Sequence, residues 1–130
     1  FMNRLTKVVG SNNHHMLFTY DEFGRINMMS NTINETSNQN EYVYGDKNVV
    51  GEIPGLIYNV KLNGTTQLSY EFDQLARLST RTLGTTTPFT TNYTYLDGAG
   101  PNSTTTLLAS MQNGSNEAFN YTYDANGNMM

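Results

Sequence analysis

The feature that most constrains the fold of this 130-residue chain is an internal repeat of about 51 residues. An aromatic residue followed by aspartate occurs three times, at separations of 52 and 51 residues, as Tyr20-Asp21, Phe72-Asp73 and Tyr123-Asp124. Between these pairs lie YVYGD with Tyr44 and YTYLD with Tyr95, which are themselves 51 residues apart. A repeat on this scale indicates that each unit is one supersecondary structure that packs against its neighbours.

The repeat divides the chain into four parts. A partial repeat covers about residues 1–17, two units follow at about 18–69 and 70–120, and a new repeat begins at 121–130. The N-terminal segment MNRLTKVV aligns with the second half of the motif, because Arg4-Leu5 corresponds to Arg25-Ile26. We therefore expect a single array of repeats, excised from a longer protein whose secretion signal lies outside this sequence.

Side chains around the repeated pairs alternate with period two, which is typical of β-strands and not of helices. The pattern is clearest at residues 19–20, 42–44, 68–72, 93–95 and 121–123. Between these segments lie three pairs that favour tight hairpin turns with positive φ, Asn63-Gly64, Asn113-Gly114 and Asn126-Gly127. The chain is thus predicted to be all-β, an array of antiparallel β-hairpins that forms a curved open sheet.

The aspartate of each motif is predicted to close a turn. Asp21 and Gly24 stand at the first and fourth positions of a four-residue turn, where the carboxylate can accept main-chain N–H groups and glycine can take positive φ. The motif at 124–127 repeats this arrangement. Asp73 instead has Ala76 at the glycine position, which predicts either a different turn or a strained one.

The arginine that follows the turn is predicted to cover an aromatic ring. Tyr20 and Phe72 precede the turn, while Arg25 and Arg77 follow it. Across a hairpin, the ring and the arginine side chain can lie close enough to stack. Asn128 takes the arginine position in the third motif, so arginine is useful there but not obligatory.

Composition excludes several classes of function. The net charge is −4 and no run of Lys or Arg could follow a phosphate backbone, so we expect no nucleic-acid binding. The absence of Cys removes disulfides, thiol catalysis and thiolate metal sites. Apolar runs fall short of the roughly 18 residues of a membrane span. Hydrophobic residues make up 37% of the chain, which predicts a folded domain with a lean hydrophobic core.

The candidate catalytic and metal-binding groups are better explained by structure. His14 and His15 are adjacent, so on a strand they would point to opposite faces, and we interpret them as a solvated loop pair. Asp21 and Asp73 recur with the repeat, and turn closure already accounts for them. The sequence has no nucleophile elbow with a partnered histidine. We therefore expect no enzyme activity, no metal and no cofactor.

The three motifs resemble the YD (tyrosine-aspartate) repeat of Rhs proteins, whose pattern is Y-x-YD-x-x-G-R-L. FTYDEFGRI (18–26), YEFDQLARL (70–78) and YTYDANGNM (121–129) carry this pattern, and residues 92–128 resemble the longer repeat of clostridial-type Rhs proteins. The resemblance covers nearly the whole chain. It implies no catalytic residue and a structural role for Tyr20, Asp21, Gly24, Arg25, Phe72, Asp73, Arg77, Tyr123, Asp124 and Gly127.

The resemblance also implies a function and a setting. In Rhs proteins, in the B and C components of insecticidal toxin complexes and in teneurins, such repeats build a hollow β-shell, which in toxins encloses a C-terminal toxin domain. We accordingly expect a non-catalytic structural segment of a secreted or cell-surface bacterial protein, packed against neighbouring repeats of the same parent chain. Unpaired sheet edges are expected to promote self-association of the segment.

A carbohydrate- or partner-binding adhesion module is the alternative. Exposed tyrosine rings beside Asn and Asp are also how proteins hold a glycan, because the ring is apolar on its faces and polar at its tip. The candidate ligand-facing rings are Tyr42, Tyr44, Tyr93, Tyr95 and Tyr121. If that face of the sheet is covered, the same rings are core or shell lining.

Overall fold

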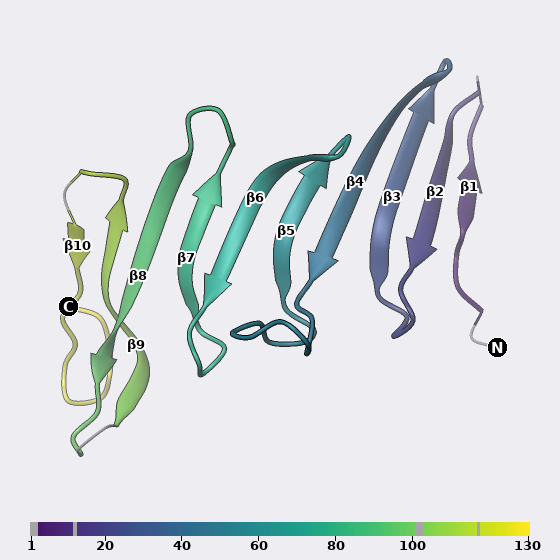
Figure 1. Ribbon diagram of the computed structural model, residues 1–130. Helices are drawn as coiled ribbons and strands as arrows, with labels where there is room; N and C mark the ends of the chain where they lie inside the picture. The colour runs from purple at the N-terminus through teal and green to yellow at the C-terminus, as the bar shows by residue number, and fades with distance from the viewer. Residues whose placement is uncertain (1–2, 12, 101–102, 117) are drawn as a thin grey trace. The chain divides into compact units, whose positions relative to one another are not determined.

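The computed structural model describes residues 3–11, 13–100, 103–116 and 118–130, which form strands, turns and loops without a helix. This described part accordingly holds no helix able to cross a membrane. Two compact units, Phe1–Leu68 and Ser69–Met130, divide the chain at a point inside strand β6 (Thr65–Phe72). In each unit, neighbouring antiparallel strands follow one another along the chain (Figure 1). The predicted all-β fold, an open antiparallel sheet of successive hairpins, is confirmed.

The first unit contains five strands before β6: β1 (Lys7–Val9), β2 (His15–Tyr20), β3 (Ile26–Ile33), β4 (Thr36–Tyr44) and β5 (Ile57–Leu62). The turn after β5 has φ of 49° at Asn63 and 79° at Gly64, as a tight hairpin requires, so this predicted turn is confirmed. The turn between β3 and β4 is also tight, with φ of 46° at Asn34 and 67° at Glu35. This second turn lacks glycine and was not predicted.

The second unit contains the end of β6 and four further strands: β7 (Leu78–Leu83), β8 (Phe89–Asp97), β9 (Thr104–Asn113) and β10 (Ala118–Asn120). The two predicted Asn-Gly turns of this unit differ from the expected form. Gly114 and Gly127 have φ of 58° and 81°, whereas Asn113 and Asn126 do not take positive φ. Each glycine therefore belongs to a longer turn than a two-residue hairpin.

Register shifts occur beside three tyrosines in or near the last residues of their strands. They fall between positions 19 and 20, 43 and 44, and 94 and 95, each time directly before a tyrosine: Tyr20, Tyr44 and Tyr95. A β-bulge redirects a side chain and increases the local twist of the strand. The irregularity thus lies where the motif's aromatic rings leave the regular pleat.

Hydrophobic side chains are nowhere fully buried among the described residues, so the predicted lean core is wrong. Of the side chains in the described ranges, only that of Thr91, which is polar, has no exposure. Phe23, Val50 and Phe119 keep 68%, 103% and 54% of their surface exposed. Within each unit the strands form a single layer, and an apolar sheet face is buried only when a second layer packs against it.

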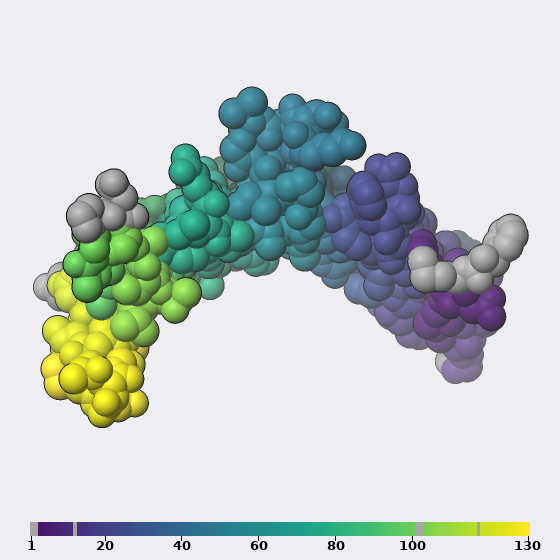
Figure 2. Space-filling view, turned by 90° about the horizontal axis from the view of Figure 1, so that it is seen from below, coloured from purple at the N-terminus to yellow at the C-terminus, as the bar shows by residue number. Residues whose placement is uncertain are grey.

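The longest connection in the first unit is the loop of residues 45–56 between β4 and β5. Gly45 is bridged to Pro54 across the base of this loop. Figure 2 shows the loop projecting from the sheet of the first unit. Its position places it next to the turn between β2 and β3, with which it shares a hollow in the surface.

Candidate functional site: an aspartate-arginine-tyrosine clasp

The first motif forms a turn that Asp21 closes with its side chain. Oδ1 of Asp21 accepts hydrogen bonds from the main-chain N–H groups of Phe23 (3.0 Å) and Arg25 (2.9 Å). Oδ2 accepts a charged hydrogen bond from Nε of Arg25 (2.6 Å). Gly24 has φ of 87°, and a Cβ there would collide with the guanidinium of Arg4. Glycine is therefore favoured here by its backbone angle, and a larger residue would also require the Arg4 side chain to shift.

The second motif repeats this turn with the same atoms. Oδ1 of Asp73 accepts the N–H groups of Leu75 and Arg77, each at 2.9 Å, and Oδ2 accepts Nε of Arg77 at 2.6 Å. Ala76 takes the glycine position with φ of 62°. Of the two predicted outcomes at Ala76, the structure has the strained one, because a side chain with Cβ is held in the left-handed region.

The third motif keeps the turn without arginine. Oδ1 of Asp124 accepts the N–H groups of Asn126 (2.9 Å) and Asn128 (2.8 Å). The amide Nδ2 of Asn128 donates to Oδ2 of Asp124 at 2.9 Å, in the place that Nε of arginine takes elsewhere. The interpretation that arginine is useful but not obligatory is confirmed for turn closure.

The arginine of each of the first two motifs stacks on the tyrosine of the following hairpin. The guanidinium of Arg25 lies 4.0 Å from the ring centroid of Tyr44, and that of Arg77 lies 4.2 Å from the ring of Tyr95. For Arg25 the expected partner was Tyr20 of the same hairpin, but the ring of Tyr20 lies near Arg4 instead. Nε is held by the aspartate at the turn, so the planar group extends toward the next strand instead. We call each set of aspartate, arginine and tyrosine a clasp.

The tyrosine hydroxyl completes the link to the preceding hairpin. Tyr44 donates to the carbonyl of Ile26 (2.9 Å), and Tyr95 donates to the carbonyl of Leu78 (2.8 Å). Both acceptors directly follow the clasp arginine. Tyr20 and Tyr123 make the equivalent bonds to the carbonyls of Leu5 (2.7 Å) and Leu108 (2.9 Å). Tyr20 is also covered by Arg4, at 5.2 Å, so the partial first repeat uses the same arrangement.

The five candidate ligand-facing rings divide into two groups. Tyr44 and Tyr95 belong to clasps, with one ring face near arginine and the hydroxyl bonded to main chain. Tyr42, Tyr93 and Tyr121 are half-buried and lie outside the clasps. Sequence reasoning found the residues of the clasp but not its pairing. The available signal was the recurring distance from arginine to the next such tyrosine, 19 residues from Arg25 to Tyr44 and 18 from Arg77 to Tyr95.

The clasp also fixes the charge state of its carboxylates. Desolvation would raise the pKa of Asp21, but hydrogen bonds from Arg25 and the positive charge of its guanidinium lower that pKa below the ordinary value of 3.8. The pKa of Asp73 is lowered in the same way through Arg77. For Asp124 the hydrogen bonds from Asn128 lower the pKa. Burial raises the pKa of Tyr95. All three aspartates are therefore anions at neutral pH.

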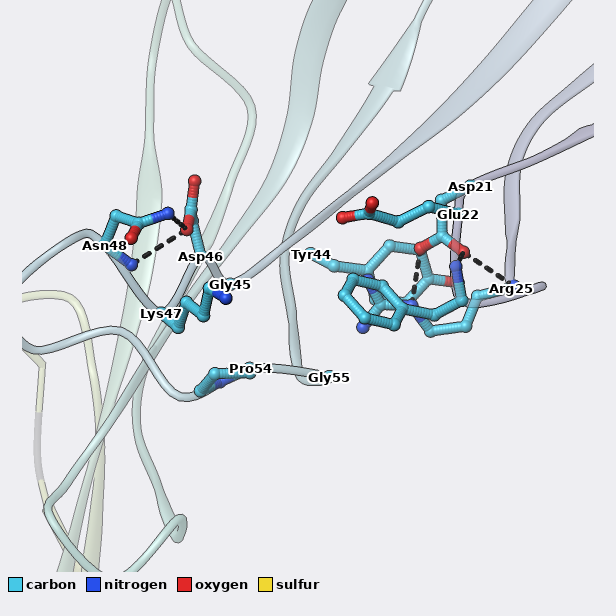
Figure 3. Close-up of a pocket in the computed structure, with 11 residues that line it drawn as sticks. Asp21, Glu22, Arg25, Tyr44, Gly45, Asp46, Lys47, Asn48, Pro54 and Gly55 are labelled. Carbon is cyan, nitrogen blue, oxygen red and sulfur yellow. Dashed lines mark hydrogen bonds and ion pairs between the residues drawn. The ribbon is translucent and has the colours of Figure 1, made fainter.

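A hollow of about 540 Å³ lies beside the first clasp. Its walls come from the Asp21 turn, from Tyr44 and from the 45–56 loop. In Figure 3, Asp46, Lys47 and Asn48 face Glu22 and Arg25 across the hollow, and Pro54 and Gly55 lie along one side. The lining offers charged and amide groups but no histidine or hydroxyl nucleophile other than the engaged phenol of Tyr44.

The histidine pair lies away from this hollow. His15 is the first residue of β2 and His14 directly precedes it, so the pair is not wholly in a loop as predicted. Nε2 of His14 is 2.8 Å from Oδ1 of Asn31, which gives it a structural partner. Among the described residues, no group of three or more His, Cys, Asp or Glu side chains is placed to hold a metal ion.

No protein-family model matches the chain, and no curated protein is similar enough to count as a relative.

Proposed function

We propose that this chain is a non-catalytic structural segment of a large secreted or cell-surface Rhs-type protein, in which it builds part of a β-sheet shell or scaffold. The enclosed partner in such an assembly would be a C-terminal toxin domain, and the direct partners would be neighbouring repeats of the parent chain. The YD-repeat resemblance supports this function, and so do the contacts that the motif residues make.

These contacts are those of the clasp. The Asp and Arg positions of the first two YD motifs are paired with each other, and each arginine stacks on the tyrosine of the next hairpin, Tyr44 or Tyr95, whose hydroxyl bonds back to the main chain of the preceding hairpin. A repeated residue set that serves catalysis would direct polar groups toward a shared cleft, whereas this set directs them at the chain itself. The motif recurs, on this proposal, because the clasp that links one hairpin to the next recurs.

Exposed apolar side chains support the same proposal. Many large hydrophobic residues keep substantial exposure on the single sheet layer, among them Val9, Leu83 and Phe89. Faces of this kind are favoured where another layer covers them. A shell made of many repeats, with contents or further layers against it, supplies such a cover.

A glycan-binding adhesion surface is the second candidate. It is favoured by Tyr42, Tyr93 and Tyr121, which are half-buried and whose hydroxyls donate no hydrogen bond within the described part of the chain. These rings retain surface and a polar tip with which a sugar could pair.

One pair of double variants separates the candidates. Tyr44→Phe with Tyr95→Phe removes two clasp hydroxyls, and Tyr42→Ala with Tyr93→Ala removes two rings outside the clasps. The structural proposal expects reduced resistance to urea in the first variant and no specific binding of the parent chain on a glycan array. Specific glycan binding that is lost only in the second variant would establish the adhesion surface in its place.

A further inference from the structure

The two complete clasps differ in what their arginines contact. At Arg77, Nη2 pairs with Oδ2 of Asp73 at 2.6 Å. Its Nη1 donates to Oγ1 of Thr104 at 2.7 Å and to the main-chain carbonyl of Thr105. The guanidinium of the second clasp is thus satisfied by the aspartate and by a hydroxyl and a carbonyl from β9.

Arg25 has the same ion pair and ring contact but no such acceptors. Nε of Arg25 donates to Asp21, and its guanidinium lies 4.0 Å from the ring of Tyr44. Within the described residues, Nη1 of Arg25 has no acceptor that corresponds to those of Arg77. Nη1 lies beside Gly55, at 3.7 Å from the point where a Cβ would stand. Nη1 therefore borders the hollow and has no acceptor from the described part of the chain.

The cause of the difference is the length of the strands beyond the clasp. Tyr44 pairs with Ile57 and Tyr95 with Leu108, so positions 53 and 54 correspond to 104 and 105. In the second unit the ribbon continues, since Asp97 pairs with Thr104, and β9 passes the arginine. In the first unit β4 ends at Tyr44, and the chain leaves as the 45–56 loop. The 45–56 loop, and not a continuing strand, therefore borders Arg25 in the first unit.

The lining of the hollow indicates the charge and shape of what fits there. The Asp21 and Arg25 charges neutralise each other, which leaves Glu22, Asp46 and Lys47 and so a slight negative excess. Phe23 offers an exposed ring next to Arg25, whose guanidinium is 5.0 Å from its centroid. A neutral or cationic ligand with an apolar portion therefore suits the site better than an anion.

We propose that this hollow binds an extended peptide segment containing serine or threonine. The hydroxyl and the main-chain carbonyl of the segment take, at Arg25, the positions that Oγ1 of Thr104 and the carbonyl of Thr105 take at Arg77. Hydrogen bonds from a charged guanidinium to such acceptors are stronger than those between neutral groups. The ligand chemistry is read from the second copy of the repeat and does not depend on the shell or adhesion assignment.

The test uses the whole chain and a blocked peptide with the sequence of residues 103–107, Ser-Thr-Thr-Thr-Leu. Titration is followed by ¹H–¹⁵N NMR of the Gly55 amide and of the Arg25 guanidinium. We expect saturable shifts at both groups. A peptide with valine in place of Thr104 keeps the shape but lacks the hydroxyl, and it should bind about threefold to tenfold more weakly, as expected for one lost hydrogen bond.

Matched variants locate the site. Phe23→Ala leaves the Asp21 and Arg25 ion pair in place and should weaken peptide binding by about threefold or more, because an exposed aromatic contact is lost. Leu75→Ala makes the corresponding change in the second motif and should leave the affinity unchanged. Arg25→Lys keeps the charge but loses the forked donors, and should weaken binding by about tenfold or more.

Three results would overturn the proposal. One is the absence of saturable shifts at millimolar peptide, with the fold intact by NMR. Another is equal weakening by Leu75→Ala and Phe23→Ala. A third is binding of a chitin oligomer, used as a sugar probe, at the same NMR groups without binding of the peptide.

Discussion

Replacing Ala76 with glycine should stabilise the second unit. Ala76 has φ of 62°, while the equivalent residues Gly24 and Gly127 have φ of 87° and 81°. Holding an alanine in the left-handed region costs about 1–2 kcal/mol. Glycine removes that strain but gains about 0.4–1 kcal/mol of unfolded-state entropy. The net expectation for Ala76→Gly is a stabilisation of about 0.5–1 kcal/mol, because the Asp73 hydrogen bonds to Leu75 and Arg77 stay unchanged.

Urea denaturation and amide exchange measure the effect. A gain of this size should move the urea midpoint up by about 0.5 M. It should also slow hydrogen exchange at the main-chain amides of Leu75 and Arg77, which donate hydrogen bonds to the Asp73 carboxylate. Ala118→Gly is the matched control, since residue 118 is in strand β10 without positive φ and should lose about 0.5–1 kcal/mol. A destabilising Ala76→Gly would refute the strain argument, as would a neutral Gly24→Ala.

Three further outcomes follow from the clasps and the sheet edges. Because the pKa values of Asp21, Asp73 and Asp124 are lowered, their contribution to stability is complete above the ordinary aspartate pKa of 3.8 and is lost as the pH falls through the lowered values. Urea midpoints measured from pH 6 down to pH 2 should therefore fall once the pH is below about 4. The variant with all three aspartates changed to asparagine should show a smaller fall. Tyr44→Phe should lower the free energy of unfolding by about 1 kcal/mol, because the hydrogen bond to the Ile26 carbonyl is lost. Tyr93→Phe removes a hydroxyl outside the clasps and should lower it much less. Equal losses in the two variants would contradict the role given to Tyr44. Light scattering at high concentration should detect oligomers of the isolated chain, because its edge strands are unpaired. Val9→Lys on the edge strand β1 should reduce the oligomers. A strictly monomeric species at every concentration would argue against edge pairing.

The repeat period predicted most of the fold, because its physical basis is local. Alternation of side chains placed the strands around Tyr20, Tyr44, Tyr95 and their neighbours, and a short acid at the start of a turn predicted the role of Asp21. These inferences need only the properties of adjacent residues. At Ala76, one of the two expected outcomes is found, a positive φ on a residue that has a Cβ.

The parts that sequence reasoning missed depend on contacts between hairpins. Arg25 stacks on Tyr44 because the ion pair with Asp21 sets the direction of the guanidinium. That direction depends on the folded turn. The hairpin at Asn34-Glu35 was missed because neither residue is glycine, although asparagine tolerates positive φ. A lean core was expected from composition, but composition does not reveal how many layers a sheet has.

The absence of a fully buried hydrophobic side chain from the described residues has a consequence for how stability is distributed. Each clasp tyrosine bonds back to the hairpin before it, and each clasp arginine stacks on the hairpin after it, so the interactions that join the chain are between nearest neighbours. The free energy of such an array is a sum over hairpins and joints, as in a one-dimensional lattice. Loss of one joint should then melt the sheet locally, while hairpins elsewhere keep their own protection. Evolution can lengthen or shorten a chain of this kind by whole repeats without refitting a common centre.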